Sequence, residues 1–129
     1  MEKFKIEKTV DKDDLDDLDH VNNVRYVQWI QDIAKAHWES KADEALKTRF
    51  FWVVSEHHIK YKSPAKLNDD IVIKTYVTKA EGVTSARVVE MHNKATDELI
   101  LKAETIWVLM DMFFKRPTRI TREIAAMFT

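Results

Sequence analysis

The residues best suited to chemistry stand together between positions 14 and 23, in the order Asp-Leu-Asp-Asp-Leu-Asp-His-Val-Asn-Asn. Carboxylates and histidines transfer protons, and a carboxylate can also act as a nucleophile. The segment directly precedes an apolar pattern with helical spacing, so it lies beside the backbone N–H groups that a helix start leaves unpaired. Such N–H groups stabilise negative charge. The segment therefore predicts an active site for a reaction that passes through an oxyanion.

A helix is predicted from about Asn23 to about Lys41, because apolar residues recur there every three or four positions. Asn22 or Asn23 can cap this helix by accepting a hydrogen bond from a backbone N–H further along. The apolar residues form two stripes, one containing Val24 and the other containing Tyr26. A helix that is apolar over most of its circumference is largely enclosed, so we expect this one to be surrounded by protein.

The rest of the chain has the composition of β-strands. Runs rich in Val, Ile, Thr, Tyr and Trp span residues 52–61, 71–78, 84–92 and 99–112, and a short strand is expected around Phe4, Ile6 and Val10. The breaks at 80–82 and 93–98 have hairpin length, which predicts antiparallel neighbours. A short helix is expected over residues 121–127. One long helix and a meander of antiparallel strands predict an α+β fold in which a curved sheet wraps around the helix.

The composition limits the possible functions. The 129 residues, 45% of them hydrophobic, predict one domain over residues 1–129 with a substantial core. With 21 Lys and Arg against 22 Asp and Glu, the net charge of −1 argues against a nucleic-acid-binding protein. The lack of cysteine excludes disulfides, thiolate metal sites and a cysteine nucleophile. The sequence shows neither a membrane-spanning apolar run nor a signal-peptide core, so we expect a cytoplasmic protein without membrane association.

Three motifs follow one another along nearly the whole chain. The most specific is Asp14-x-Asp16-x-x-x-His20-Val21-Asn22-Asn23-x-x-Tyr26-x-x-Trp29. The second runs from Ile59 through Pro64 to Asp70, and the third from Trp107 to Ile120. With them the chain resembles the hotdog-fold thioesterases of the 4-hydroxybenzoyl-CoA thioesterase-like group. It is more similar still to the branch with a His-Val-Asn-Asn motif, which includes the acyl-ACP thioesterases.

This resemblance implies a hotdog fold and the hydrolysis of an acyl thioester, acyl-CoA or acyl-ACP, to a free acid and a thiol. It implies that Asp16 is the catalytic carboxylate, either as a nucleophile or as a base on water. The backbone N–H of Asn23 would polarise the thioester carbonyl, and His20 would be part of the site. It implies neither a cofactor nor a metal, and its setting is lipid metabolism.

Three further residues are expected at the substrate: Asn22, Tyr26 and Ser63. Ser63 is the nearest polar candidate on the strand after the helix, because the acidic and cysteine residues of the plant-type enzymes correspond there to Pro64 and Ala65. The chain also departs from the family at Asp19, where most relatives have a small or neutral residue before the histidine. Asp19 either pairs with His20 or faces water.

Two other functions compete with thioester hydrolysis. A hotdog-fold hydratase or dehydratase also uses an Asp and a His near the helix start, but its usual Asn-Pro between them is absent here. A non-catalytic acyl-thioester-binding protein would have no need of Asp16.

Several side chains allow both a functional and a structural interpretation. His57 and His58 cannot readily chelate one metal ion, because adjacent strand residues point to opposite faces. The four tryptophans are expected in the core and interfaces, with one or two lining an apolar acyl pocket. The basic residues are either contacts for CoA phosphates or solvated charges; they are Lys60, Lys62, Lys66, Arg116 and Arg119.

The sheet also predicts an oligomer. An edge strand with unpaired N–H and C=O groups needs a cover, and a second copy pairing edge to edge by a two-fold axis supplies one. We attribute to the same contact the apolar residues on both faces of the last long strand, such as Ile100 and Leu101. The expected assembly is a homodimer or a tetramer with the active site at the subunit interface.

Overall fold

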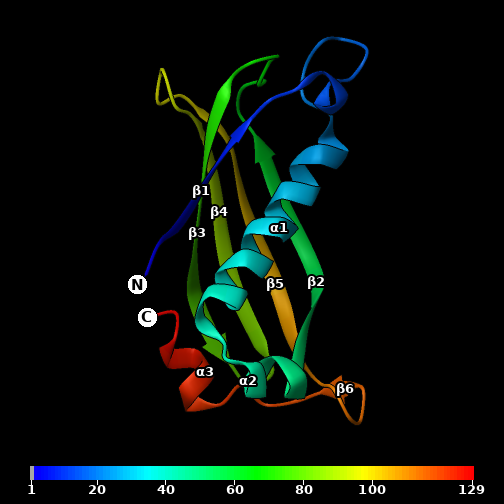
Figure 1. Ribbon diagram of the computed structural model, residues 1–129, viewed down its shortest axis with the longest axis vertical. Coiled ribbons are helices and arrows are strands. Elements are labelled where there is room, and N and C mark those ends of the chain that lie inside the picture. Colours follow the sequence, from blue (N-terminus) through cyan, green and yellow to red (C-terminus); the bar gives the residue numbers. More distant parts are fainter. Residues whose placement is uncertain (1) are drawn as a thin grey trace.

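A computed structural model describes residues 2–129, in which a curved antiparallel sheet wraps around one long helix (Figure 1). The sheet order is β1-β3-β4-β5-β2, and β6 pairs with the end of β5. The elements in chain order are β1 (Phe4–Thr9), η1 (Lys12–Asp14), α1 (Asn23–Lys41), α2 (Glu44–Arg49), β2 (Phe50–Tyr61), β3 (Asp70–Glu81), β4 (Thr84–Asn93), β5 (Leu99–Asp111), β6 (Arg116–Pro117) and α3 (Arg122–Ala126). The α+β hotdog architecture and the antiparallel hairpins β3–β4 and β4–β5 are confirmed.

The helix α2 was not predicted from the sequence. This helix has six residues, too few for an apolar period to be recognised, and its evidence in the sequence is a cap. The side chain of Asp43 accepts a hydrogen bond from the N–H of Leu46 at 2.9 Å. Leu46 is buried and joins Trp38 and Phe50 in a cluster at the C-terminal end of α1, so α2 closes that end of the core.

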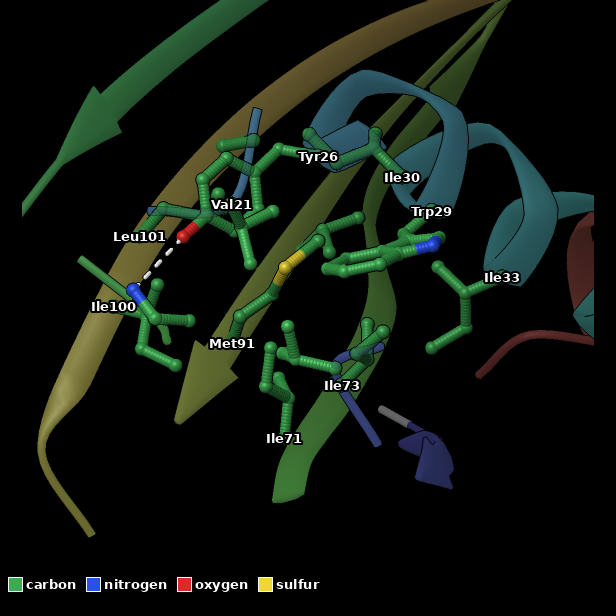
Figure 2. Close-up of a cluster of buried hydrophobic side chains, with 14 residues drawn as sticks. Val21, Tyr26, Trp29, Ile30, Ile33, Ile71, Ile73, Met91, Ile100 and Leu101 are labelled. Atoms are coloured by element: carbon green, nitrogen blue, oxygen red, sulfur yellow. Dashed lines mark hydrogen bonds between the residues drawn. The ribbon is translucent and has the colours of Figure 1, made fainter. Parts of the chain in front are cut away.

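The main core lies between α1 and the concave face of the sheet. Figure 2 shows the Trp29 indole beside the Met91 side chain, with Ile33 and Ile73 nearby. Ile33, Ile73 and Met91 are completely enclosed. Each such side chain stabilises the fold by roughly 1.5–3 kcal/mol relative to an exposed one. This burial fixes the axis of α1 across the sheet and thereby the place where its N-terminus emerges.

The outer face of α1 is open, so the expectation that the helix is enclosed was wrong for a single chain. Tyr26, Trp29 and Ile33 face the sheet, whereas Val24 is 73% exposed and Asp32 lies in solvent. Members of both apolar stripes are buried within the chain, such as Ile30 and Ile33, so the exposed part of the helix is its polar face together with Val24 in the first turn.

The edges of the sheet are β1 and β2, not β5. Because β5 lies between β4 and β2, an edge-to-edge contact does not explain its apolar residues on both faces. Ile100 and Leu101 are already buried within one chain. The N–H groups of Lys62 and Ser63 both donate to the carbonyl of Ile100, so the chain after β2 covers this part of β5. The earlier attribution of these two residues to a subunit contact was therefore wrong.

A chain of polar side chains crosses the buried end of the sheet. Arg87 donates from Nη1 to Nδ1 of His37 at 2.9 Å and to Oγ1 of Thr75 at 3.0 Å. Because Nδ1 of His37 accepts, Nε2 carries the proton and donates to Oε1 of Glu2 at 2.9 Å. Burial lowers the pKa of His37 below its ordinary value of 6.5, and the nearby charge of Arg87 lowers it further. His37 is therefore held as a neutral donor and acceptor.

No helix among residues 2–129 combines the length and the apolar character needed to cross a membrane.

The neutral state of His37 predicts a pH-dependent stability. The unfolded chain takes up a proton near the ordinary histidine pKa, and the folded chain does so only at lower pH, so stability falls as the pH drops below about 6.5. His37→Gln keeps a donor and an acceptor but does not titrate. We expect urea unfolding between about pH 7 and 5 to show a shallower loss of stability for His37→Gln than for the unsubstituted protein. Parallel pH dependences would contradict the assignment.

Candidate active site

Asp16 lies in the loop between η1 and α1, and only one of its two carboxylate oxygens accepts hydrogen bonds from residues 2–129. Its Oδ1 accepts hydrogen bonds from the N–H groups of Leu18 at 2.8 Å and His20 at 3.1 Å. Its own N–H donates to the carbonyl of His20 at 2.7 Å. Within residues 2–129, Oδ2 makes no hydrogen bond and no ion pair. The loop thus fixes the carboxylate through one oxygen and leaves the other available to react.

Asp14 has a structural role instead. It is 4% exposed, and its Oδ2 accepts from the N–H of Asp11 at 3.0 Å. Its Oδ1 lies 3.3 Å from Nε of Arg25, which stands on the first turn of α1. A buried carboxylate needs such partners, and these join η1 to the helix. The two aspartates of the motif therefore differ in environment: both oxygens of Asp14 have partners, whereas only one oxygen of Asp16 does within residues 2–129.

The start of α1 presents an unpaired donor. Asn22 is the N-cap, and its Oδ1 accepts from the N–H of Val24 at 2.9 Å. The N–H groups of Arg25 and Tyr26 donate to the carbonyl of Asn22. The N–H of Asn23 has no acceptor among residues 2–129. It stands at the positive end of a 19-residue helix, which favours an anion there.

The loop after β2 holds the helix start in place through Ala65. The N–H of Val21 donates to the carbonyl of Ala65 at 3.0 Å, and the N–H of Ala65 donates to the hydroxyl of Tyr26 at 3.1 Å. Tyr26 is 3% exposed, and burial raises the pKa of its hydroxyl. The structure thus shows Tyr26 positioning a backbone loop. His20 forms an isolated β-bridge with Lys66 of the same loop.

The ring of His20 is half-buried and makes no hydrogen bond within residues 2–129. Asp19 is exposed, adopts a φ of 60°, and forms no ion pair with His20. Of the two interpretations of Asp19, the structure thus favours the one in which it faces water. The imidazole of His20 remains free to exchange a proton with a ligand.

The other candidates are divided between the two ends of the molecule. The hydroxyl of Ser63 donates to the carbonyl of Leu99 at 2.8 Å, which ties it to the backbone of β5. Lys66 adjoins His20, whereas Arg116 lies in β6 at the opposite end and stacks on Phe114 (Figure 1). Of these basic candidates, the structure therefore places Lys66 beside the loop that precedes the helix, and Arg116 far from it.

A cavity of about 480 Å³ opens between one flank of α1 and the strands β2, β5 and β4. Its volume is in the usual range of small-molecule pockets. Three of the four tryptophans line it (Trp38, Trp52 and Trp107), whereas Trp29 lies in the core. Gln28 and Gln31 line both this cavity and a shallow hollow that begins at Asn23.

Arg87 and Ser85 also line the cavity, and neither was predicted from the sequence. A signal was present. Arg87 stands two and four positions before the apolar residues Val89 and Met91, so the period of a strand places it on the same face as these core side chains.

Comparisons with known proteins place this geometry in context. The family model described as the acyl-ACP thioesterase N-terminal domain matches residues 1–128. A search of curated proteins found no match.

Solved structures share the fold at low sequence identity. A 1,4-dihydroxy-2-naphthoyl-CoA thioesterase from Synechocystis superposes with a TM-score of 0.84 at 15% identity, covering 98% of this chain and 96% of that one. A Staphylococcus aureus protein in complex with CoA gives a TM-score of 0.86 at 13% identity, with 98% and 81% covered. The 12:0-ACP thioesterase from Umbellularia californica gives 0.83 at 16% identity, with 98% of this chain and 51% of that one covered. The chain thus spans about half of the plant enzyme.

The cap of α1 gives a testable consequence. Asn22→Ala removes the acceptor of the Val24 N–H and should lower the free energy of unfolding by about 1 kcal/mol. Asn23→Ala is the matched control, because the exposed Asn23 side chain makes no hydrogen bond within the described chain. Chemical denaturation of both variants measures the difference. Equal losses of stability in the two would contradict the assignment of Asn22 as the cap.

Proposed function

We propose that this chain, which belongs to the acyl-ACP thioesterase family and hydrolyses acyl thioesters, uses Asp16 as its catalytic carboxylate. One observation carries the proposal. In a loop where Asp14, Asn22 and one oxygen of Asp16 are all hydrogen-bonded, the second Asp16 oxygen and the N–H of Asn23 have no partner among residues 2–129. A nucleophile or base and an oxyanion donor are the two groups that acyl transfer requires.

The reaction follows from these two groups. The thioester carbonyl oxygen accepts a hydrogen bond from the N–H of Asn23, which stabilises the negative charge that develops on it. Asp16 either attacks the carbonyl carbon and expels the thiolate, giving a mixed anhydride that water cleaves, or takes a proton from an attacking water. Both routes end in a free acid and a thiol. His20 exchanges a proton with the departing sulfur, because its ring is half-buried and has no partner in residues 2–129.

Asn22, Tyr26 and Ser63 support the site in different ways. Asn22 keeps α1 capped so that its N-terminus stays formed, and Tyr26 holds Ala65 against it. Ser63 ties the loop after β2 to β5. We therefore assign these residues to the positioning of the substrate site and not to direct chemistry.

The carrier of the acyl group is CoA or acyl carrier protein, both of which present phosphate. The fold relatives include a protein in complex with CoA and a 12:0-ACP thioesterase. Lys60, Lys62 and Lys66 are exposed at the end of β2 and in the following loop, beside the site. Solvated lysines of this kind favour an anionic carrier. The proposal includes a cytoplasmic location, as expected for such substrates.

The proposal includes a homodimer, or a tetramer built from dimers. The 12 residues of β2 form a free edge of the sheet, and Val53 and Tyr61 on this strand are 38% and 47% exposed. At the site end, Leu18 and Val24 are 75% and 73% exposed. A second copy pairing along β2 would cover the edge and bring its own residues against the helix start.

The role of Asp16 can be tested by substitution. Asp16→Asn keeps an oxygen that can accept from Leu18 and His20 but removes the charge, so thiol release from acyl-CoA should slow by roughly 10²–10⁴-fold with little loss of stability. The measurement is the steady-state rate with a thiol-reactive dye.

Asp17→Asn is the matched control, because Asp17 is exposed in the same loop and should tolerate the change. His20→Ala should give an intermediate loss, since the carboxylate and the Asn23 N–H stay in place. If Asp16→Asn retained activity within a few-fold of the unsubstituted protein, Asp16 would not be the catalytic group.

The dimer can be tested at the edge of β2. Light scattering at micromolar concentration should give a mass of at least twice the 15.2 kDa of one chain. Val53→Lys places a charge on the free edge and should shift the mass toward one chain while lowering activity. Ala80→Lys makes a similar change at an exposed position of β3, which β4 and β5 separate from β2, and should leave both the mass and the activity unchanged. A fully active single chain would overturn the shared-site arrangement.

A further inference from the structure

The cavity beside α1 has a positive charge on its inner wall. Arg87 projects from β4, which lies two strands inside the free edge at β2, and 6% of its surface is exposed. The charges on the cavity lining from α1 and α2 balance, with Lys35 and Lys47 against Asp32 and Glu39. Arg87 therefore gives the cavity its net charge. Much of the remaining wall is apolar: Trp38, Phe50, Phe51, Trp52, Trp107, Met112 and Phe128.

Three N–H bonds of the Arg87 guanidinium have no acceptor in the part of the chain that the structure describes. Nη1 donates to His37 and Thr75, but Nε and Nη2 donate to nothing within residues 2–129. Neither atom is completely enclosed, because the fully buried polar atoms without partners in the described chain are ring nitrogens of other residues. No carboxylate of the described chain forms an ion pair with Arg87. Glu2 is reached only through neutral His37 and is shared with Lys41.

A buried cation without a counter-ion is costly, and this one stays charged. Burial lowers the pKa of Arg87 to about 10, which still leaves it protonated at neutral pH. Nε and Nη2 form one edge of the guanidinium, the pair of parallel donors that a carboxylate accepts with both oxygens. An acyl chain ending in a methyl group would displace water from these donors without replacing its hydrogen bonds.

We propose that Arg87 binds a carboxylate at the distal end of the acyl chain, so that the preferred substrate is the monothioester of a long-chain dicarboxylic acid. This rests on the proposed function, which places the thioester at Asn23. Gln28 and Gln31 line both the hollow at Asn23 and the cavity, and so mark a route along α1. His37, the partner of Arg87, lies 14 positions after Asn23, on the order of 20 Å along the helix. Only a long chain covers that span.

The test compares acyl-CoA pairs of equal chain length, one ending in a methyl group and the other in a carboxylate. The unsubstituted protein should show a higher kcat/KM for the carboxylate-ended member at long chain lengths. Arg87→Met should lower that value roughly 10–100-fold, mainly through KM, because a charge-assisted hydrogen-bond pair is lost. Hydrolysis of the methyl-ended member should be retained or improved. Arg122→Met, at an exposed position on α3, should change neither.

An equal loss on both members would show that Arg87 acts only in the fold, and an unsubstituted protein without preference would overturn the proposal. A second measurement is independent of any variant. Free long-chain dicarboxylic acids should inhibit the unsubstituted protein more strongly than monocarboxylic acids of the same length, and equal or weaker inhibition would also overturn it. If no acyl thioester of either series were cleaved, the proposed function would fail, and calorimetric binding of the free diacid would still decide the role of Arg87.

Discussion

The pair of hydrogen bonds at Ala65 is the interaction on which the site depends. This residue is fully buried, and it accepts from the N–H of Val21 while donating to the hydroxyl of Tyr26. One bond holds the loop that carries Asp16, and the other holds the first turns of α1. Since Ala65 follows β2, the Asp16 loop and the first turns of α1 are both held against the sheet. A loop carboxylate and a helix N-terminus thereby acquire a fixed relation that neither element could impose alone.

The sequence was sufficient for the elements with strong local patterns. The limits of α1 at Asn23 and Lys41 were predicted because a cap and a sustained apolar period mark them. The antiparallel order of β3, β4 and β5 followed from hairpin-length breaks. The short helix α2 was missed since its packing through Leu46, not its local pattern, stabilises it. The enclosure of α1 was overestimated because the sequence shows that a face is apolar but not what covers it.

Within the site, the sequence identified residue types but not their environments. Asp14 and Asp16 are the same residue type. What distinguishes them is the ion pair of Asp14 with Arg25, which forms only once the loop has folded back onto the helix. Ser63 looked available and is bound to the backbone of β5. Arg87 went unnoticed, although its phase along β4 pointed to the core. For Asp14 and for Ser63 the deciding partner is distant in sequence, so a local pattern could not contain it.

The two core clusters differ in whether they border the cavity. The cluster around Trp29 and Ile33 lies beneath the helix start and contributes no cavity wall, so it can be packed for rigidity. Members of the other cluster, among them Trp38 and Phe128, also line the cavity, where packing is incomplete. Substitutions in the cavity should therefore leave the carboxylate of Asp16 and the N–H of Asn23, at the other end of α1, in place. The buried cation Arg87 is tolerable beside the second cluster because the cavity lets water or a ligand reach its guanidinium. The first cluster has no such opening, so a cation there would stay without a polar partner.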